Sequence, residues 1–170
     1  RAALAPLIAA DRHDFIVIDC SPSLGILTMN VLTAAHGVIM PIQCEYYALE
    51  GLSVMKRLVD QLRTSGSNPD VQVEGIVMTM YDARTNLSQQ VVQEVVAHYP
   101  DKVFETMIPR NVRLSEAPSH GKPIVQYASY STGAAAYRQL AREFLRRRGG
   151  EDEETPVGGG LGAGFRPDTQ

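Results

Sequence analysis

A single carboxylate at the end of an apolar run is the first group in the sequence that could do chemistry. The apolar residues 15–18 lead into Asp19, and a turn with Pro22 and Gly25 follows. A run without polar alternation predicts a strand buried on both faces, as in a parallel sheet covered by helices. At the carboxyl end of such a strand, an aspartate can hold the water shell of Mg²⁺ or orient a water beside a phosphate. The alternative is an aspartate that caps the turn, and the pattern alone leaves both interpretations open.

A second polar group follows the predicted strand at residues 71–80. The stretch T-M-Y-D-A-R-T leaves Tyr81, Asp82 and Arg84 in a loop at the same edge of the sheet. Such a loop can line a base pocket or a partner surface. The alternative is a turn that begins the next helix, with Asp82 or Thr85 as the N-terminal cap.

The third group, within residues 108–124, is dense in polar side chains and also follows a predicted strand. Pro109 stiffens the exit from the strand, and Arg110 and Arg113 supply cations. Asn111 offers an amide that can recognise the edge of a base. The alternative is a surface loop that contains a short helix.

Several motifs that would define a function are missing from the 170 residues. Neither G-x-x-x-x-G-K-[ST] nor G-x-G-x-x-G occurs, and the pair Gly121-Lys122 lacks the flanking residues of a phosphate loop. The four histidines show no spacing typical of a metal site, and no serine lies in a G-x-S-x-G turn.

Length and composition are those of one soluble globular domain. The net charge of −3 provides no general basic field, so any contact with DNA needs a local patch. No apolar run approaches the roughly 20 residues that span a bilayer, and we expect no signal peptide. The two cysteines, Cys20 and Cys44, are predicted to be buried free thiols in a reducing compartment. Because the chain begins with Arg1 rather than Met, we expect the protein to start earlier.

The apolar pattern alternates between strand and helix up to about residue 148. Strands of this kind, separated by helices, indicate βαβ units and a largely parallel sheet. The final helix is expected to turn Tyr137, Leu140, Ala141, Phe144 and Leu145 inward. The predicted strands are 15–19, 37–41, 71–80 and 103–108, and the predicted helices are 26–35, 48–65, 86–99 and 132–148.

The end of the chain differs in composition from the rest. Residues 146–170 hold seven of the 14 glycines beside a four-residue acidic run. Such a segment buries too little apolar surface to offset its loss of conformational entropy. We therefore predict one domain over residues 1–148 and a disordered Gly-rich, acidic tail over residues 149–170.

Four stretches taken in order resemble one family. They are D-F-I-V-I-D-C-S-P-S-L-G, P-I-Q-C-E-Y-Y-A-L-E-G, T-M-Y-D-A-R-T-N-L and I-P-R-N-V-R-L-S-E-A-P-S-H-G-K-P-I. Together they are similar to the ParA chromosome-partitioning ATPases of the deviant-Walker P-loop family, which also contains MinD. The resemblance covers residues 1–148. It implies an α/β fold, a doubly wound and mostly parallel sheet with helices on both faces, as in P-loop NTPases.

The resemblance also implies an activity. A family member of this type binds ATP and Mg²⁺, forms a homodimer around two nucleotides and then binds DNA without sequence preference. A ParB-type partner stimulates hydrolysis. Such a protein is cytoplasmic and associated with the nucleoid, and it has no membrane partner.

The resemblance assigns roles to individual residues. Asp19 corresponds to the Walker B aspartate, which acts in catalysis on Mg²⁺ through water, and residues 20–25 correspond to the second switch. Residues 45–51 lie near the dimer face, and Arg84 and Arg113 are candidates for contact with DNA or nucleotide. The adenine-side wall comprises Tyr81, Asp82, Pro109, Arg110 and Asn111.

The chain also departs from the family pattern. The phosphate loop, the first switch and the first, central strand of the sheet are expected before Asp19, and this sequence contains none of them. We therefore expect an exposed apolar sheet edge and no useful ATP hydrolysis by the 170 residues alone. One alternative is a non-enzymatic, truncated paralogue that binds a partition partner or an intact ATPase. Another is a MinD-like, membrane-associated ATPase, which would need an amphipathic C-terminal helix instead of Gly and Glu.

Overall fold

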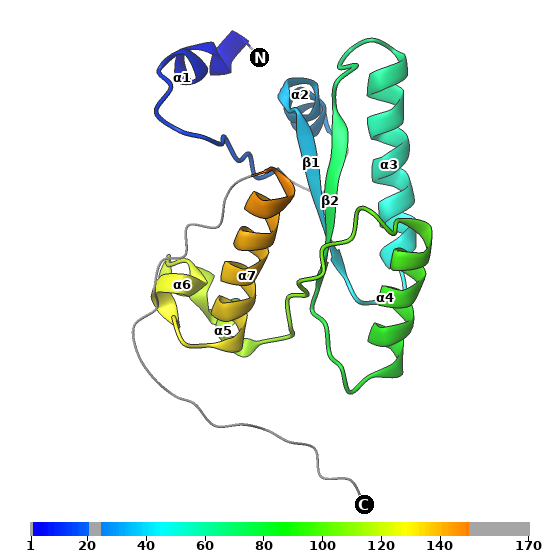
Figure 1. The fold of residues 1–170 in the computed structure, drawn as a ribbon, viewed down its shortest axis with the longest axis vertical. Helices are drawn as coiled ribbons and strands as arrows, with labels where there is room; N and C mark the ends of the chain where they lie inside the picture. Colours follow the sequence, from blue (N-terminus) through cyan, green and yellow to red (C-terminus); the bar gives the residue numbers. More distant parts are fainter. Residues whose placement is uncertain (1, 21–24, 150–170) are drawn as a thin grey trace, which may run out of the picture.

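Two parallel strands and the helices around them form the body of the protein (Figure 1). The computed structural model describes residues 2–20 and 25–149. The elements are η1 (Ala2–Leu4), α1 (Ala5–Ala9), α2 (Ile26–Ala34), β1 (Gly37–Gln43), α3 (Ala48–Thr64), β2 (Gln72–Thr79), α4 (Asn86–His98), α5 (Val112–Glu116), η2 (Ala117–His120), α6 (Ile124–Tyr127) and α7 (Thr132–Arg147). The predicted strands 37–41 and 71–80 and all four predicted helices are therefore present. The α/β fold class is confirmed.

The strands β1 and β2 pair in parallel, and the helix α3 forms the crossover connection between them. Their register runs from Gly37 opposite Gln72 to Gln43 opposite Thr79, with an irregularity after Val38. Parallel strands need a crossover of this length, so the β1–α3–β2 unit follows from the sequence pattern.

Residues 103–109 lie along the other edge of β2 but pair with it only at their ends. Parallel bridges join Ile76 to Val103 and Tyr81 to Pro109. Between the bridges, the backbone N–H groups of Glu105 and Thr106 donate to the carboxylate of Glu143 in α7, at 2.8 and 2.9 Å. The predicted strand 103–108 is thus wrong as a continuous strand, because a side chain from a helix takes the place of the sheet partner.

Helices cover both faces of the sheet, as predicted. Ile76 and Met78 of β2 belong to an apolar cluster with residues of α3 and α4. Val77, between them, faces the opposite side and packs with Phe104 and with partly buried residues of α7. This alternation is the period-two pattern of a strand, and it explains why all three residues of β2 are buried.

Gly75 allows the α7 side of the sheet to pack closely. A Cβ atom at this position would overlap the ring of Phe104. The guanidinium of Arg147, at the end of α7, lies 4.3 Å from the centroid of the same ring. The absence of a side chain at Gly75 therefore lets the ring lie directly against β2.

The predicted buried strand at residues 15–19 is wrong. These residues form no helix or strand, and Phe15 and Val17 are 43% and 89% exposed. Among the described residues, β1 pairs with β2 alone, so its other edge is open, in line with the exposed edge expected. A strand is stable in a core only where its backbone N–H and C=O groups find partners, and no strand of the described residues pairs with residues 15–19. Cys20, predicted to be buried, is exposed for the same reason.

The inward face of α7 also differs from the prediction. Leu140 and Phe144 do pack into the core, but Tyr137, Ala141 and Leu145 are exposed. The buried residues of this helix are Gly133, Ala134 and Glu143. The helix is therefore rotated toward its small residues and its one buried carboxylate.

Within residues 2–20 and 25–149, no helix has both the length and the apolar character needed to cross a bilayer. The predicted tail and most of the turn at 20–25 lie outside the described residues.

Candidate functional site at the carboxyl end of the sheet

The loop after β2 and the segment after residue 108 meet at one edge of the sheet, as predicted. Met80, directly after β2, has φ 54°, a left-handed conformation that is uncommon outside glycine. This turn brings Tyr81 beside Pro109. The Tyr81 N–H donates to the Ile108 carbonyl at 3.1 Å, and the Arg110 N–H donates to the Tyr81 carbonyl at 2.9 Å. Backbone hydrogen bonds therefore fix the half-buried Tyr81 ring and Pro109 as neighbours.

An ion pair ties the loop after β1 to the same edge. The Arg110 guanidinium lies 3.3 Å from the Glu45 carboxylate, and both side chains are about half exposed. The two residues are 65 positions apart in the sequence, so no local sequence pattern predicts this ion pair. The region 45–51 thus lies beside the Tyr81–Pro109 edge.

Asp82 is engaged with its own loop. Its two carboxylate oxygens accept from Arg84 Nε at 2.9 Å and Arg84 Nη2 at 2.7 Å, and the Arg84 backbone N–H donates to Oδ1 at 3.0 Å. The side-chain hydrogen bond from Arg84, followed by the backbone one, lowers the pKa of Asp82 to about 2. Thr85 caps α4 by accepting from the Ser88 N–H at 3.4 Å. The turn-and-cap interpretation of this loop is therefore confirmed, with Thr85 as the cap.

Asn111 uses both ends of its amide within the protein. Its oxygen accepts from the Arg113 N–H at 2.9 Å and so caps α5, and its Nδ2 donates to the Thr132 hydroxyl at 2.7 Å. Arg113 in turn pairs with Glu116 at 2.9 Å. The interpretation of this segment as a loop with a short helix is confirmed as well.

Asp19 lies apart from this edge. Phe15 packs edge-on against Phe144 near the end of α7, with 5.3 Å between ring centroids. Four residues beyond Phe144, Arg148 pairs with Glu74 near the start of β2 at 2.9 Å. Figure 1 shows the segment before residue 21 beside this upper end of α7, opposite the loop after β2. The segment before residue 21 therefore does not lie at the edge where the other two groups meet, and the role of Asp19 stays a prediction.

The residues present fit a base better than a metal. The described residues contain no group of three or more His, Cys, Asp or Glu side chains that could hold a metal ion. Asp19 is exposed, and the segment before residue 21 runs beside the upper end of α7 in Figure 1, so these residues do not form a magnesium site together. In contrast, the ring of Tyr81 beside Pro109 offers an apolar surface of the kind that packs against a base.

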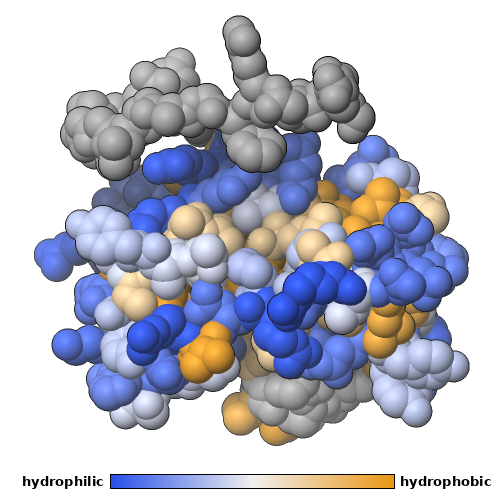
Figure 2. Space-filling model, turned by 90° about the horizontal axis from the view of Figure 1, so that it is seen from below, coloured by the Kyte–Doolittle hydropathy of each residue, from blue (hydrophilic) through white to orange (hydrophobic). Residues whose placement is uncertain are grey.

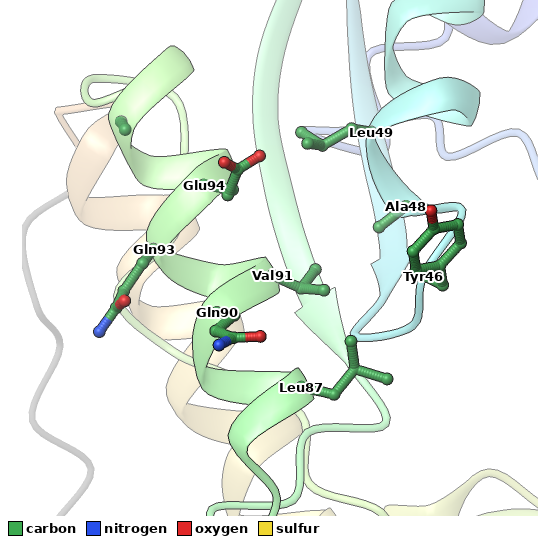
Figure 3. Close-up of a pocket in the computed structure, with 9 residues that line it drawn as sticks. Tyr46, Ala48, Leu49, Leu87, Gln90, Val91, Gln93 and Glu94 are labelled. Carbon is green, nitrogen blue, oxygen red and sulfur yellow. The ribbon is translucent and has the colours of Figure 1, made fainter.

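A groove that sequence reasoning missed lies between the start of α3 and α4 (Figure 3). Its volume is about 620 Å³. The lining holds one carboxylate and no cation, so it does not suit a phosphate group. The lining residues are Tyr46, Ala48, Leu49, Leu87, Gln90, Val91, Gln93, Glu94 and Ala97.

Seen from the carboxyl end of the strands, the surface is mainly hydrophilic (Figure 2). Hydrophobic side chains gather on the right of this view, where α3 and α4 lie in Figure 1. The loop after β2, which carries Arg84, and the helix α5, which carries Arg113, lie toward this end of the molecule, the lower end of Figure 1.

Comparison with known proteins identifies close relatives. A family model described as an AAA domain matches residues 7–73. Chromosome partitioning protein ParA of Myxococcus xanthus is 52% identical over 147 residues, which cover 86% of this chain and 51% of that protein. Sporulation initiation inhibitor protein Soj of Bacillus subtilis is 57% identical over 132 residues, which cover 78% of this chain and 52% of the relative.

A solved structure has the same fold. The crystal structure of cobyrinic acid a,c-diamide synthase from Mycobacterium smegmatis with bound ADP and magnesium matches with a TM-score of 0.66 at 36% identity. The match covers 87% of this chain and 53% of that one. The chain thus spans about half the length of the relatives it matches. On the strength of about 50% identity along most of its length, the chain belongs to the ParA/Soj family of chromosome-partitioning proteins.

Proposed function

We propose that this chain is part of an ATPase that partitions a chromosome or plasmid. The observation that carries the proposal is the 52% identity, over 86% of the chain, to a protein named for chromosome partitioning. In this proposal the intact protein binds ATP and Mg²⁺, dimerises with nucleotide and binds DNA without sequence preference. A ParB-type partner stimulates the hydrolysis, in the cytoplasm and at the nucleoid.

The edge formed by Tyr81, Pro109 and Arg110 is the proposed adenine-side wall. Its support is the backbone pairing of Tyr81 with residues 108–110, which holds a ring and a proline side by side. The cation of Arg110 and the amide of Asn111 lie on the same segment. Asp82 belongs to this wall by resemblance, but its carboxylate is occupied by Arg84.

The proposed role of Asp19 rests on the resemblance alone. A water-mediated magnesium contact needs the aspartate at the carboxyl end of a strand, beside the phosphates. Residues 15–19 have neither the strand nor that position here. The proposal therefore requires this segment to join the sheet, beside the open edge of β1, in the intact protein.

ATP turnover tests this assignment. In the intact protein with Mg²⁺, Asp19→Ala should abolish hydrolysis, while Asp14→Ala, which removes another exposed carboxylate of the same segment, should leave the rate within about twofold. The 170-residue chain alone should show no turnover, because it contains no phosphate loop. Unchanged hydrolysis in Asp19→Ala would remove the residue from the mechanism.

Arg84 and Arg113 are the proposed contacts to DNA phosphates. Both are highly exposed, with 88% and 60% of their side chains accessible. Arg84→Glu or Arg113→Glu in the intact protein should weaken binding to any duplex and flatten its salt dependence. The same affinity and the same salt slope as the parent protein would contradict the contact.

Two alternatives predict other results. A non-enzymatic adaptor would capture the ParB-type partner equally well with and without nucleotide. A MinD-like protein would bind vesicles of anionic lipid when ATP is present. Partner capture that depends on ATP, without lipid binding, supports the partition ATPase.

A further inference from the structure

The two arginines proposed to contact DNA share one feature: each is already paired with a carboxylate two or three positions away along the chain. Asp82 holds Arg84 through two side-chain hydrogen bonds, and Glu116 holds Arg113 at 2.9 Å. The Asp82–Arg84 pair lies in the loop after β2, whereas Arg113 and Glu116 lie three positions apart in α5, so one local motif does not account for both. The shared arrangement calls for a physical explanation.

We propose that Asp82 and Glu116 keep Arg84 and Arg113 as electrically neutral pairs, and that these carboxylates limit the affinity for the phosphates of nucleic acid. This inference rests on the proposed function, since it concerns the same DNA contacts. It also gives Asp82 a role other than that of a base-pocket residue.

The geometry at Asp82 supports a carboxylate that stays in place when phosphate arrives. The Asp82 side chain is 18% exposed and that of Arg84 is 88% exposed, so the carboxylate lies beneath the guanidinium. The Arg84 backbone N–H also holds Oδ1 at 3.0 Å. Arg84 Nε and one N–H of Nη2 donate to Asp82, which leaves the second N–H of Nη2 and both N–H groups of Nη1 for another acceptor. A phosphate bound there would be near a fixed negative charge, and like charges this close repel.

The carboxylate of Glu116, like that of Asp82, is held in place by a further hydrogen bond besides those from the guanidinium of its arginine. Its Oε2 accepts from Arg113 at 2.9 Å and also from the Tyr127 hydroxyl at 3.1 Å. The tyrosine belongs to α6, so the carboxylate is anchored to a second element. Phosphate therefore meets a guanidinium whose charge is already compensated by an anchored neighbour.

Neutralising each carboxylate tests the proposal. Asp82→Asn and Glu116→Gln keep the shape of each side chain and one acceptor oxygen. At position 82 this oxygen can still accept from the Arg84 backbone N–H and Nε, and at position 116 it can accept from Arg113, so the loop after β2 and α5 should be retained. In the intact protein with ATP and Mg²⁺, each should raise the affinity for a random-sequence duplex about threefold at low salt. Each should also steepen the plot of log affinity against log salt by up to about 0.9, as expected for one more phosphate neutralised.

A matched control separates a local effect from a change in net charge. Asp60→Asn removes one exposed carboxylate, which is paired with Lys56 at 2.7 Å on α3 and is separate from the loop after β2 and from α5. It should leave the salt slope unchanged. An equal gain in all three variants would reduce the effect to net charge and overturn the proposal.

The remaining outcomes are also decisive. A loss of affinity in Asp82→Asn or Glu116→Gln would mean that the carboxylate orients its arginine for the phosphate, and it would overturn the proposal. Unchanged affinity, while Arg84→Glu and Arg113→Glu still weaken binding, would overturn this inference and leave the proposed function intact. If those arginine variants bind as the parent does, the DNA contact itself fails.

Discussion

Two apolar runs of similar composition, residues 15–18 and the middle of β2, differ in their burial. In residues 15–18, Phe15 is 43% exposed and Val17 89% exposed, whereas Ile76 and Met78 of β2 are fully buried. Both runs predict a strand buried on two faces. The difference shows that an apolar run favours burial, but that the run is buried only where neighbouring strands and helices cover it.

The run in β2 has partners in every direction. β1 pairs along one edge, residues 103–109 lie along the other, and apolar clusters that include α3, α4 and α7 cover the two faces. Residues 15–18 make a ring contact between Phe15 and Phe144, and within residues 2–20 and 25–149 no strand pairs with them. The apolar side chains of residues 15–18 are therefore exposed, and the edge of β1 that faces away from β2 is open as well.

The second edge of β2 depends on one carboxylate, and its removal should have the largest effect. Glu143 is 4% exposed, accepts the N–H groups of Glu105 and Thr106, and pairs with Arg147 at 2.7 Å. Glu143→Ala leaves these donors without an acceptor and should lower the free energy of unfolding by about 3 kcal/mol. Urea denaturation of the 170-residue chain measures the loss. A change as small as that of an exposed surface variant would show that residues 103–109 do not need α7.

The pH dependence of stability identifies the charge as the cause. Burial raises the pKa of Glu143, but hydrogen bonds from Thr106 and the backbone and the charge of Arg147 outweigh it, so the pKa is lowered. A lowered pKa adds stability above the ordinary value of 4.5, and this stability is lost as the pH falls through the folded-state value. Glu143→Gln should therefore lie closer to the parent protein in acid than at neutral pH. A constant difference would contradict the charge-based explanation.

Local patterns predicted most of the fold. The apolar spacing gave α3 and α4 their positions, and Thr85 is the cap that its residue type suggests. The meeting of Tyr81 with Pro109 follows because the carboxyl ends of parallel strands share an edge. The Asp82–Arg84 pair is also local, since the two residues are separated by one position.

Distant partners account for what the sequence did not predict. The interruption of strand 103–108 comes from Glu143, 38 positions after Glu105, and Arg110 finds Glu45 across 65 positions. Residues 15–19 carry the strong pattern of a buried strand, but that pattern does not say which strand lies beside it. In each case the missing information is the identity of a neighbour far along the chain.

Truncation of one side chain in each run gives a smaller but direct test of the comparison. In the 170-residue chain, Ile76→Ala removes packing in a fully buried site and should cost about 2–3 kcal/mol. Val17→Ala should cost less than about 0.5 kcal/mol, because the side chain is 89% exposed. Equal losses in urea denaturation would place residues 15–18 in a core, as the sequence pattern predicts, and would remove the contrast.

The labelling rates of the two cysteines test the same contrast through exposure of the thiols instead of through the free energy of unfolding. Cys20 follows the first run and is exposed, whereas Cys44 follows β1 and is buried, and burial raises the pKa of its thiol to about 11. Because the thiolate is the reactive form, a maleimide at pH 8 should label Cys20 rapidly and Cys44 only when the chain unfolds. Cys20→Ser and Cys44→Ser assign the two rates. Slow labelling of both thiols would mean that residues 15–20 are covered in solution, and fast labelling of both would mean that the end of β1 opens as readily as the segment before residue 21.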